Sequence, residues 1–233
     1  MTQGSAGTTG TSRRSVRVLI IEDHTLFAES LELALSLEGY DVRRADTESG
    51  SASTLLAAAI RSRPRVALLD LDLGRIGPGT RLIRPLVAAG INVVVVTAFA
   101  DDVRAGECLR YGARTVLQKT RPLNDILGAV RKINHGLPLM DREERERLIR
   151  IWHDQQQERR RLHEHLLLLT PREQEVLGHL MQGHSVRDIA AISVVSEATV
   201  RTQVKSILAK LEVSSQLAAV GLAHHVGWRP AGS

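Results

Sequence analysis

The chain of 233 residues contains one cysteine, Cys108, and few aromatic side chains. A single cysteine forms neither an intramolecular disulfide nor a cysteine-rich zinc site, which suits a reducing compartment. Phe, Trp and Tyr make up 3% of the residues, so stacking platforms for single-stranded nucleic acid are not expected. No apolar run approaches the roughly 20 residues that a membrane-spanning helix needs. Together these absences predict a soluble, cytoplasmic protein.

The chain also lacks a strong excess of charge of either sign, because it has 31 basic and 26 acidic residues and therefore a net charge of +5. The excess is not concentrated near the C-terminus, where residues 166–233 hold six Lys and Arg and five Asp and Glu. Composition alone is therefore weak evidence for a nucleic-acid partner. A hydrophobic content of 43% is that of a folded protein, and the length favours two domains.

Changes of pattern divide the chain into five segments. Residues 1–15 are polar and rich in Gly, Ser and Thr, which predicts a disordered tail. Residues 16–135 alternate short β-branched runs with helical stretches, and residues 136–165 are dense in charged, helix-favouring side chains. Residues 166–228 contain short helices without a strand pattern, and residues 229–233 form a second tail. We therefore expect two folded domains joined by a helical linker.

Residues 16–135 repeat a strand followed by a helix five times. Each helix ends near a glycine or a polar turn, and the run Val93–Val96 is typical of a strand buried on both faces. Five such units predict an α/β fold with a five-stranded, doubly wound parallel sheet of the flavodoxin-like kind. The expected strands are residues 16–21, 40–44, 66–71, 91–97 and 114–118, and the expected helices are residues 26–37, 51–60, 80–89, 103–111 and 122–134.

The linker of residues 136–165 has an apolar stripe at helical spacing, interrupted by Gln155 and Arg159. Such a broken seam is compatible with pairing to a second copy of the chain and equally with a solvated connector, and both interpretations stay open. The stripe consists of Leu148, Ile151, Trp152, Leu162 and Leu166.

Charged and hydroxyl side chains lie at or just after the ends of four of the predicted strands. Since ligands bind outside the carboxyl ends of parallel strands, we expect these side chains to converge at one edge. Clustered carboxylates repel one another unless a cation lies between them, and Mg²⁺ prefers carboxylate, water and phosphate oxygens. A carboxylate beside the metal can attack a phosphoryl group, while a hydroxyl and an ammonium hold the phosphoryl oxygens. The residues are Glu22, Asp23, Asp70, Asp72, Thr97 and Lys119.

This order of acid pair, aspartate, threonine and lysine closely resembles the receiver domain of bacterial two-component response regulators. The resemblance covers about residues 16–135 and implies a regulator rather than an enzyme, phosphorylated on Asp70 by a sensor histidine kinase with Mg²⁺ as cofactor. It implies Thr97 as the switch hydroxyl and Lys119 as the phosphate-contacting lysine. The implied metal ligands are Glu22, Asp23, Asp70 and Asp72, the last through its backbone carbonyl.

Two positions depart from that family. Val116 stands where receivers usually have an aromatic residue, and Thr120 replaces the usual proline after the lysine. Both departures concern transmission of the signal to the second domain rather than phosphorylation chemistry, so a phosphorylation-independent regulator, controlled by dimerisation or a ligand, is an alternative.

A second alternative is an enzyme, because Asp70-Leu-Asp72 also matches the Asp-x-Asp of haloacid-dehalogenase-like phosphatases. Those enzymes carry it on their first strand, whereas the acid pair comes first here.

Residues 166–228 contain strong helix-start patterns. Thr170 and Glu173 form a capping box, Ser185 begins a second one, and Ser196 can cap a third helix. Two short helices joined by a tight turn make a helix-turn-helix. The expected helices are residues 171–182, 186–192, 197–211 and 216–225.

The helix of residues 197–211 buries one face and exposes another. Arg201 and Lys205 lie one turn apart on the second face, together with Thr202 and the helix start at Thr199. In a helix-turn-helix, the N-terminal residues of the second helix enter the major groove. Taken alone, these two cations and Lys210 are better explained as a solvated face.

The wider pattern resembles the LuxR-type DNA-binding domain over about residues 166–228. Combined with a receiver, it places the chain near the NarL/FixJ class of response regulators. Gln203 and Gln216 replace residues typical of the family, which affects the DNA sequence preference rather than DNA binding itself. The motifs are Leu169–Leu177, Gly183, Ile189-Ala190, Thr199-Val200, Val204, Ile207-Leu208 and Lys210-Leu211.

This second resemblance implies that phosphorylation promotes homodimerisation and binding to paired half-sites in double-stranded promoter DNA. It implies dimer contacts at Leu217 and Val220 of the last helix, although packing within the domain explains these residues equally well. The implied DNA-binding residues are Thr199, Arg201, Thr202 and Lys205.

Overall fold

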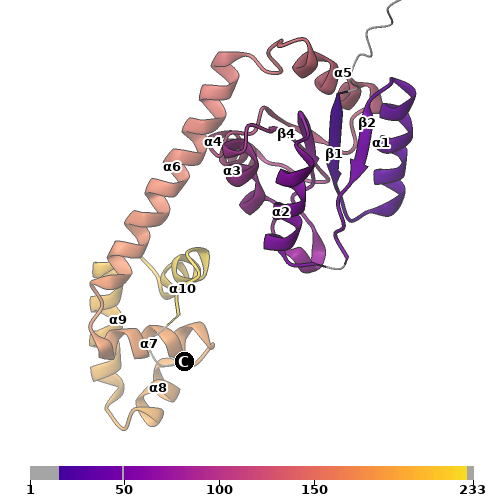
Figure 1. Ribbon diagram of the computed structural model, residues 1–233. Coiled ribbons are helices and arrows are strands. Elements are labelled where there is room, and N and C mark those ends of the chain that lie inside the picture. The colour runs from indigo at the N-terminus through magenta and orange to yellow at the C-terminus, as the bar shows by residue number, and fades with distance from the viewer. Residues whose placement is uncertain (1–15, 49, 230–233) are drawn as a thin grey trace, which may run out of the picture. The chain divides into compact units, whose positions relative to one another are not determined.

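The computed structural model describes residues 16–48 and 50–229 (Figure 1). They form two compact units, of which the first ends at Trp152 and the second begins at His153. The predicted tail of residues 1–15 and most of the tail of residues 229–233 lie outside the described residues. Within the described part of the chain, no helix combines the length and the apolar character needed to cross a bilayer.

The sheet of the first unit is parallel throughout, with the strand order β2-β1-β3-β4-β5. This order confirms the predicted doubly wound, flavodoxin-like α/β fold. It reverses direction between β1 and β3, the place where open α/β sheets bind ligands. The strands are β1 (Arg17–Ile21), β2 (Asp41–Arg44), β3 (Val66–Leu69), β4 (Asn92–Thr97) and β5 (Thr115–Gln118).

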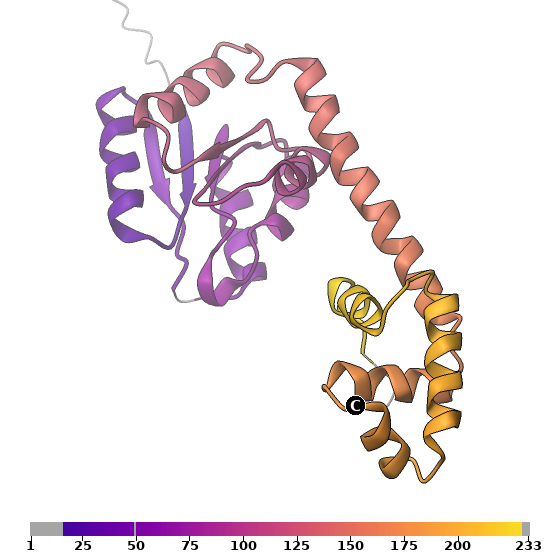
Figure 2. The same ribbon diagram turned by 180° about the vertical axis from the view of Figure 1, so that it is seen from behind.

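Helices cover both faces of this sheet, as Figures 1 and 2 show from opposite sides. α1 and α5 bury their apolar side chains in one core, and α2, α3 and α4 bury theirs in the other. The helices are α1 (Thr25–Leu37), α2 (Ala52–Ser62), the short 3-10 helix η1 (Gly74–Ile76), α3 (Thr80–Ala88), α4 (Asp102–Arg110) and α5 (Leu123–Asn134).

The apolar run in β4 shows why the sheet is buried on both sides. Successive residues of a strand point to opposite faces, so Val93 and Val95 pack with α2 and α3, whereas Val94 and Val96 pack with α1 and α5. All four side chains are 2% exposed or less. A strand with polar residues at alternate positions could not occupy this central place.

The third strand is shorter than the sequence predicts. Residues 66–71 were expected to be extended, but β3 ends at Leu69, because the chain then turns toward η1. The Leu71 carbonyl accepts a hydrogen bond from the Gly79 amide, and Asp72 forms an isolated bridge with Pro78. Asp70 thus follows the last strand residue directly, at the sheet edge where the predicted site lies.

Much of the predicted linker is one long helix, α6 (Arg142–Leu167), whose two ends belong to different units. In the first unit, Leu148 is 5% exposed and its carbonyl lies against Gly106 of α4. In the second unit, Leu166 is fully buried and Leu162 packs against the same core. The chain itself therefore covers part of the stripe at each end, and pairing with a second copy stays a prediction.

The second unit consists of the end of α6 and four shorter helices around one core. Its helix starts follow the sequence closely, because capping boxes form at Thr170 and Ser185 and the Ser196 side chain accepts from the Thr199 amide. The four helices are α7 (Pro171–Met181), α8 (Val186–Ile192), α9 (Glu197–Lys210) and α10 (Gln216–His225).

Candidate functional site

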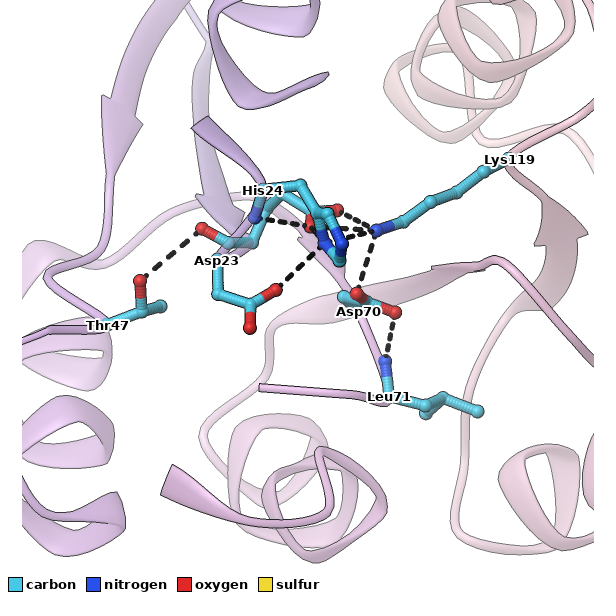
Figure 3. Close-up of polar contacts among 7 residues, drawn as sticks. Asp23, His24, Thr47, Asp70, Leu71 and Lys119 are labelled. Atoms are coloured by element: carbon cyan, nitrogen blue, oxygen red, sulfur yellow. Dashed lines mark hydrogen bonds and ion pairs between the residues drawn. The ribbon is translucent and has the colours of Figure 1, made fainter. Parts of the chain in front are cut away.

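An acidic pocket lies at the carboxyl ends of β1 and β3, where the strand order reverses (Figure 3). Glu22 follows β1 and is 7% exposed, and Asp70 follows β3 and is 2% exposed. Two carboxylates that are this deeply buried need positive charge or hydrogen-bond donors beside them. The sequence predicted this convergence, since the ends of parallel strands share one edge.

Lys119 supplies that positive charge from beyond the end of β5. Its Nζ lies 2.7 Å from the Glu22 carboxylate and 2.8 Å from Asp70 Oδ2 (Figure 3). Burial by itself lowers the pKa of Lys119, but the hydrogen bonds to Asp70 and Glu22 outweigh it and raise that pKa above its usual value. The lysine therefore stays charged and links the ends of β1, β3 and β5.

Asp70 is fixed through both of its carboxylate oxygens. Oδ1 accepts a hydrogen bond of 2.6 Å from the Leu71 amide, while Oδ2 accepts the bond from Lys119. The side chain is therefore oriented by backbone on one side and by a cation on the other. A carboxylate held in this way loses little further freedom when it attacks an electrophile.

The pocket also has the donors for a divalent cation. Glu22, Asp23, His24 and Asp70 each offer one ligand atom, and these four atoms lie within 4.8 Å of one another. Asp23 Oδ1 is buried and accepts no hydrogen bond from the described residues, although the His24 Nδ1 atom is 3.0 Å away. A buried carboxylate oxygen without a donor suits a hard cation such as Mg²⁺.

Two further residues of this neighbourhood are His24 and Asp72. His24 was not predicted, although it directly follows the acid pair and its Nδ1 lies 3.0 Å from Glu22 Oε1. The Asp72 side chain is exposed and outside the group of four, so only its backbone carbonyl is left for the predicted role.

Thr97, the last of the predicted residues of this site, lies at the end of β4. It is 3% exposed, and its carbonyl accepts the Lys119 amide at 2.8 Å, which ties the end of β4 to the residue after β5. The neighbouring Val116 of β5 is half-buried against the core shared by α2, α3 and α4. Thr97 thus lies at the same edge of the sheet as the predicted side chains that the structure brings together, which are Glu22, Asp23, Asp70 and Lys119.

Helix α9 presents the predicted DNA-contacting residues in the second unit. Thr199, Arg201, Thr202 and Lys205 are all exposed, whereas Val200, Val204 and Ile207 are buried. The Arg201 guanidinium lies 3.2 Å from the Glu197 carboxylate one turn earlier. In α10, Leu217 is 82% exposed and Val220 is half-buried.

Comparison with known proteins finds a matching family for each of the two units. Residues 18–131 match the family model described as "Response regulator receiver domain", and residues 167–223 match "Bacterial regulatory proteins, luxR family". The Response regulator protein VraR of Staphylococcus aureus is 30% identical over 209 residues, which cover 88% of this chain and 95% of VraR. This chain is a response regulator. The membership favours the receiver interpretation of Asp70-Leu-Asp72 over the phosphatase family.

The fold of this response regulator also has a solved counterpart. The RcsB response regulator of Salmonella typhimurium aligns with 90% of this chain and 100% of its own, with a TM-score of 0.52 and 20% sequence identity. At that identity the likeness concerns the fold alone. It supports the succession of a five-stranded receiver domain and a helical LuxR-type domain.

In the receiver domain, α4 is covered by the first turns of α6. Arg145 donates hydrogen bonds of 2.8 and 2.9 Å to the carbonyls of Leu109 and Ala113, which closes the C-terminal end of α4. Near the other end, Arg147 reaches Asp102 at 2.9 Å. Gly106 lies between these two contacts and brings the backbones of α4 and α6 together. The periodicity of the sequence did not indicate this packing.

We expect Gly106→Ala to destabilise the receiver domain by about 2 kcal/mol, although alanine is the better helix former. A Cβ atom at residue 106 would lie 2.1 Å from the Leu148 carbonyl oxygen, so α4 and α6 would have to separate. Urea unfolding followed by circular dichroism measures the loss. The control is Gly128→Ala in α5, where the nearest atom is 3.9 Å away and stabilisation of about 0.5–1 kcal/mol is expected. Equal effects at both glycines would contradict this packing.

In the LuxR-type domain, Glu173 joins α7 to α9. Its carboxylate accepts from the Thr170 amide at 2.7 Å, from Ser206 Oγ at 2.6 Å and from Lys210 Nζ at 2.7 Å. The sequence predicted only the capping contact with Thr170 and left Lys210 among cations of a solvated face. That placement of Lys210 was wrong, since its ammonium is bound to the Glu173 side chain, which is 8% exposed.

Proposed function

We propose that this response regulator accepts a phosphoryl group on Asp70 from the phosphohistidine of a sensor histidine kinase. The observation that carries the proposal is the position of Asp70, which is buried between the Leu71 amide and Lys119 and borders the group of metal-binding donors. In the transfer, the P–N bond of the phosphohistidine breaks and a P–O bond to an Asp70 carboxylate oxygen forms. The product is an aspartyl-phosphate.

Mg²⁺ would be held by Glu22, Asp23, Asp70 and the backbone carbonyl of Asp72, and it supplies neutralisation of the phosphoryl charge. The buried Oδ1 atom of Asp23, which accepts no hydrogen bond from the described residues, supports this assignment. Lys119 pairs with a phosphoryl oxygen while it keeps its contact with Glu22. The resulting charge distribution differs from that of the unphosphorylated pocket, in which Lys119 binds Asp70 itself.

The output is binding of the C-terminal domain to double-stranded promoter DNA in the cytoplasm. In this proposal, the receiver domain of residues 16–135 acts through Thr97 and Lys119, across the linker of residues 136–165, on the DNA-binding domain of residues 166–228. Phosphorylation promotes a homodimer that occupies two half-sites, in line with the symmetry of helix-turn-helix regulators. Leu217 and Val220 are the proposed dimer contacts, and the large exposure of Leu217 supports them.

Thr199, Arg201, Thr202 and Lys205 are the proposed contacts to bases and phosphates. Arg201→Ala combined with Lys205→Ala should weaken operator binding at least about tenfold and reduce the slope of log K against log salt by about 2. Fluorescence anisotropy at several salt concentrations measures both quantities. As a charge-matched control, Arg61→Ala with Lys132→Ala in the receiver domain should change neither. An unchanged affinity and slope in the α9 variant would show that another face contacts DNA.

The whole proposal is tested by measuring whether phosphorylation of the receiver domain changes DNA binding by the second domain. The protein first selects its operator from a random DNA pool, and its affinity for that DNA is then measured with and without acetyl phosphate and Mg²⁺. We expect phosphorylation to tighten binding. Unchanged affinity of a protein that is demonstrably phosphorylated would contradict the coupling. It would favour the phosphorylation-independent alternative, for which Val116 in place of an aromatic residue is the specific observation.

A further inference from the structure

A hollow of about 570 Å³ lies in the receiver domain between α2 and the edge of the sheet. That volume is within the range of small-molecule sites in proteins. The hollow is distinct from the acidic pocket, and its lining includes Arg17, Leu19, Arg43, Asp46, Leu55 and Ala58.

The sequence of β2 explains why this space exists. β2 pairs in parallel with β1, with Arg17 opposite Asp41 and Leu19 opposite Arg43, and such pairs share one face of the sheet. The side chains of β2 that face α2 are therefore the acidic Asp41 and the basic Arg43. An apolar side chain at either position would fill the space between the strand and the helix. The facing side of α2 adds small residues, Ala58 among them, so the gap between helix and strand stays open.

The floor of the hollow is apolar, and the exposed Arg43 lies at its rim. Arg17 Nε lies 2.7 Å from Asp41, and its Nη1 donates to the Ser62 carbonyl, so this side chain is fixed. Arg43 lies 3.4 Å from the same Asp41, its one ion-pair partner among the described residues, and its side chain is 65% exposed. One carboxylate is thus shared by two guanidinium groups. The third arginine of the lining, Arg44, pairs with Glu29 and Glu32 of α1, so Arg43 is the arginine of the lining whose charge is least compensated.

We propose that this hollow binds a small amphipathic anion, with an apolar body on Leu19, Leu55 and Ala58 and its carboxylate or phosphate on Arg43. The shape and the charge both select this class of ligand. A neutral apolar molecule would leave Arg43 unused, and a purely ionic one would leave the apolar floor in water.

The position of the hollow allows a bound ligand to affect the phosphorylation pocket through a shared loop. Asp46 and Gly50 line the hollow, and Thr47, between them, donates to the Glu22 carbonyl at 3.5 Å. Thr47 and Glu48 also border a smaller cavity beside Asp23. The loop after β2 therefore borders both places, and a ligand is one of the two means of control in the phosphorylation-independent alternative.

Titration of the ¹⁵N-labelled full-length protein with octanoate tests the proposal, since no phosphorylation is needed for the measurement. We expect saturable amide shifts confined to residues around the hollow, with octanol and acetate each binding at least about tenfold more weakly. Shifts spread over the surface, or octanol binding as tightly as octanoate, would overturn the proposal.

Two variants locate the site, each with a matched control on α2. Ala58→Leu fills the hollow and should weaken octanoate binding at least about tenfold, whereas Ala57→Leu, at an exposed position outside the lining, should not. Arg43→Gln should weaken binding of octanoate by about tenfold and that of octanol little, whereas Arg61→Gln should affect neither. Urea unfolding confirms that each variant is folded. Octanoate binding that survives both Ala58→Leu and Arg43→Gln would overturn the assignment.

Discussion

Asp70→Asn should abolish acyl-phosphate formation when the protein is incubated with acetyl phosphate and Mg²⁺. The substitution keeps the size of the side chain and removes the nucleophilic carboxylate, so transfer has no acceptor. Asparagine can still accept from the Leu71 amide, and the loss of one charge relieves repulsion with Glu22, so the fold should persist. Intact-protein mass spectrometry, with hydroxylamine to cleave the acyl phosphate, measures the labelled fraction.

The matched control for this experiment is Asp72→Asn. That side chain is exposed and lies two residues away, and its proposed role uses only the backbone carbonyl. Labelling of the control should therefore stay close to that of the unaltered chain. Chelation of Mg²⁺ should suppress labelling in both, because Glu22, Asp23 and Asp70 would then lack the cation that neutralises the incoming phosphoryl group. A label that survives Asp70→Asn would move the phosphoacceptor to another residue.

The fold and the acidic pocket could be predicted because both follow from local pattern and simple geometry. The valine run of β4 requires a strand covered on both faces, and helices between parallel strands provide that cover. Once the strands are parallel, the residues after them must share an edge, which is how Glu22, Asp70 and Lys119 meet. The helix starts of the second unit were equally accessible, because a capping box lies within four residues of sequence.

What the sequence did not indicate depends on contacts between distant segments. The packing of α6 on α4 joins residues 32 to 45 positions apart, and a glycine inside a helical pattern is its only local sign. Lys210 looks like a surface cation because its partner, Glu173, belongs to another helix. The hollow beside α2 arises from the register of β2 against β1, which the sequence alone does not specify.

Glu173→Gln should destabilise the LuxR-type domain by about 3 kcal/mol at pH 7, and this loss should disappear in acid. Burial raises the pKa of Glu173, but hydrogen bonds from Lys210, Ser206 and Thr170 outweigh it and lower the pKa from 4.5 to about 2. A carboxylate with a lowered pKa in the folded state stabilises that state fully above the pKa of the unfolded chain. The stabilisation is therefore complete above about pH 4.5 and is lost as the pH falls toward 2.

Urea unfolding of the unaltered chain and the variant between pH 7 and pH 3, followed by the fluorescence of the buried Trp228, measures this difference. The control is Glu175→Gln on the same helix, whose carboxylate is 56% exposed and pairs with Arg172, so at most about 0.5 kcal/mol should be lost at any pH. A gap between Glu173→Gln and the unaltered chain that stays constant down to pH 3 would contradict the lowered pKa. Because Ser206 and Lys210 lie on α9, losing this carboxylate should also loosen the helix that carries Arg201 and Lys205 and weaken DNA binding at neutral pH.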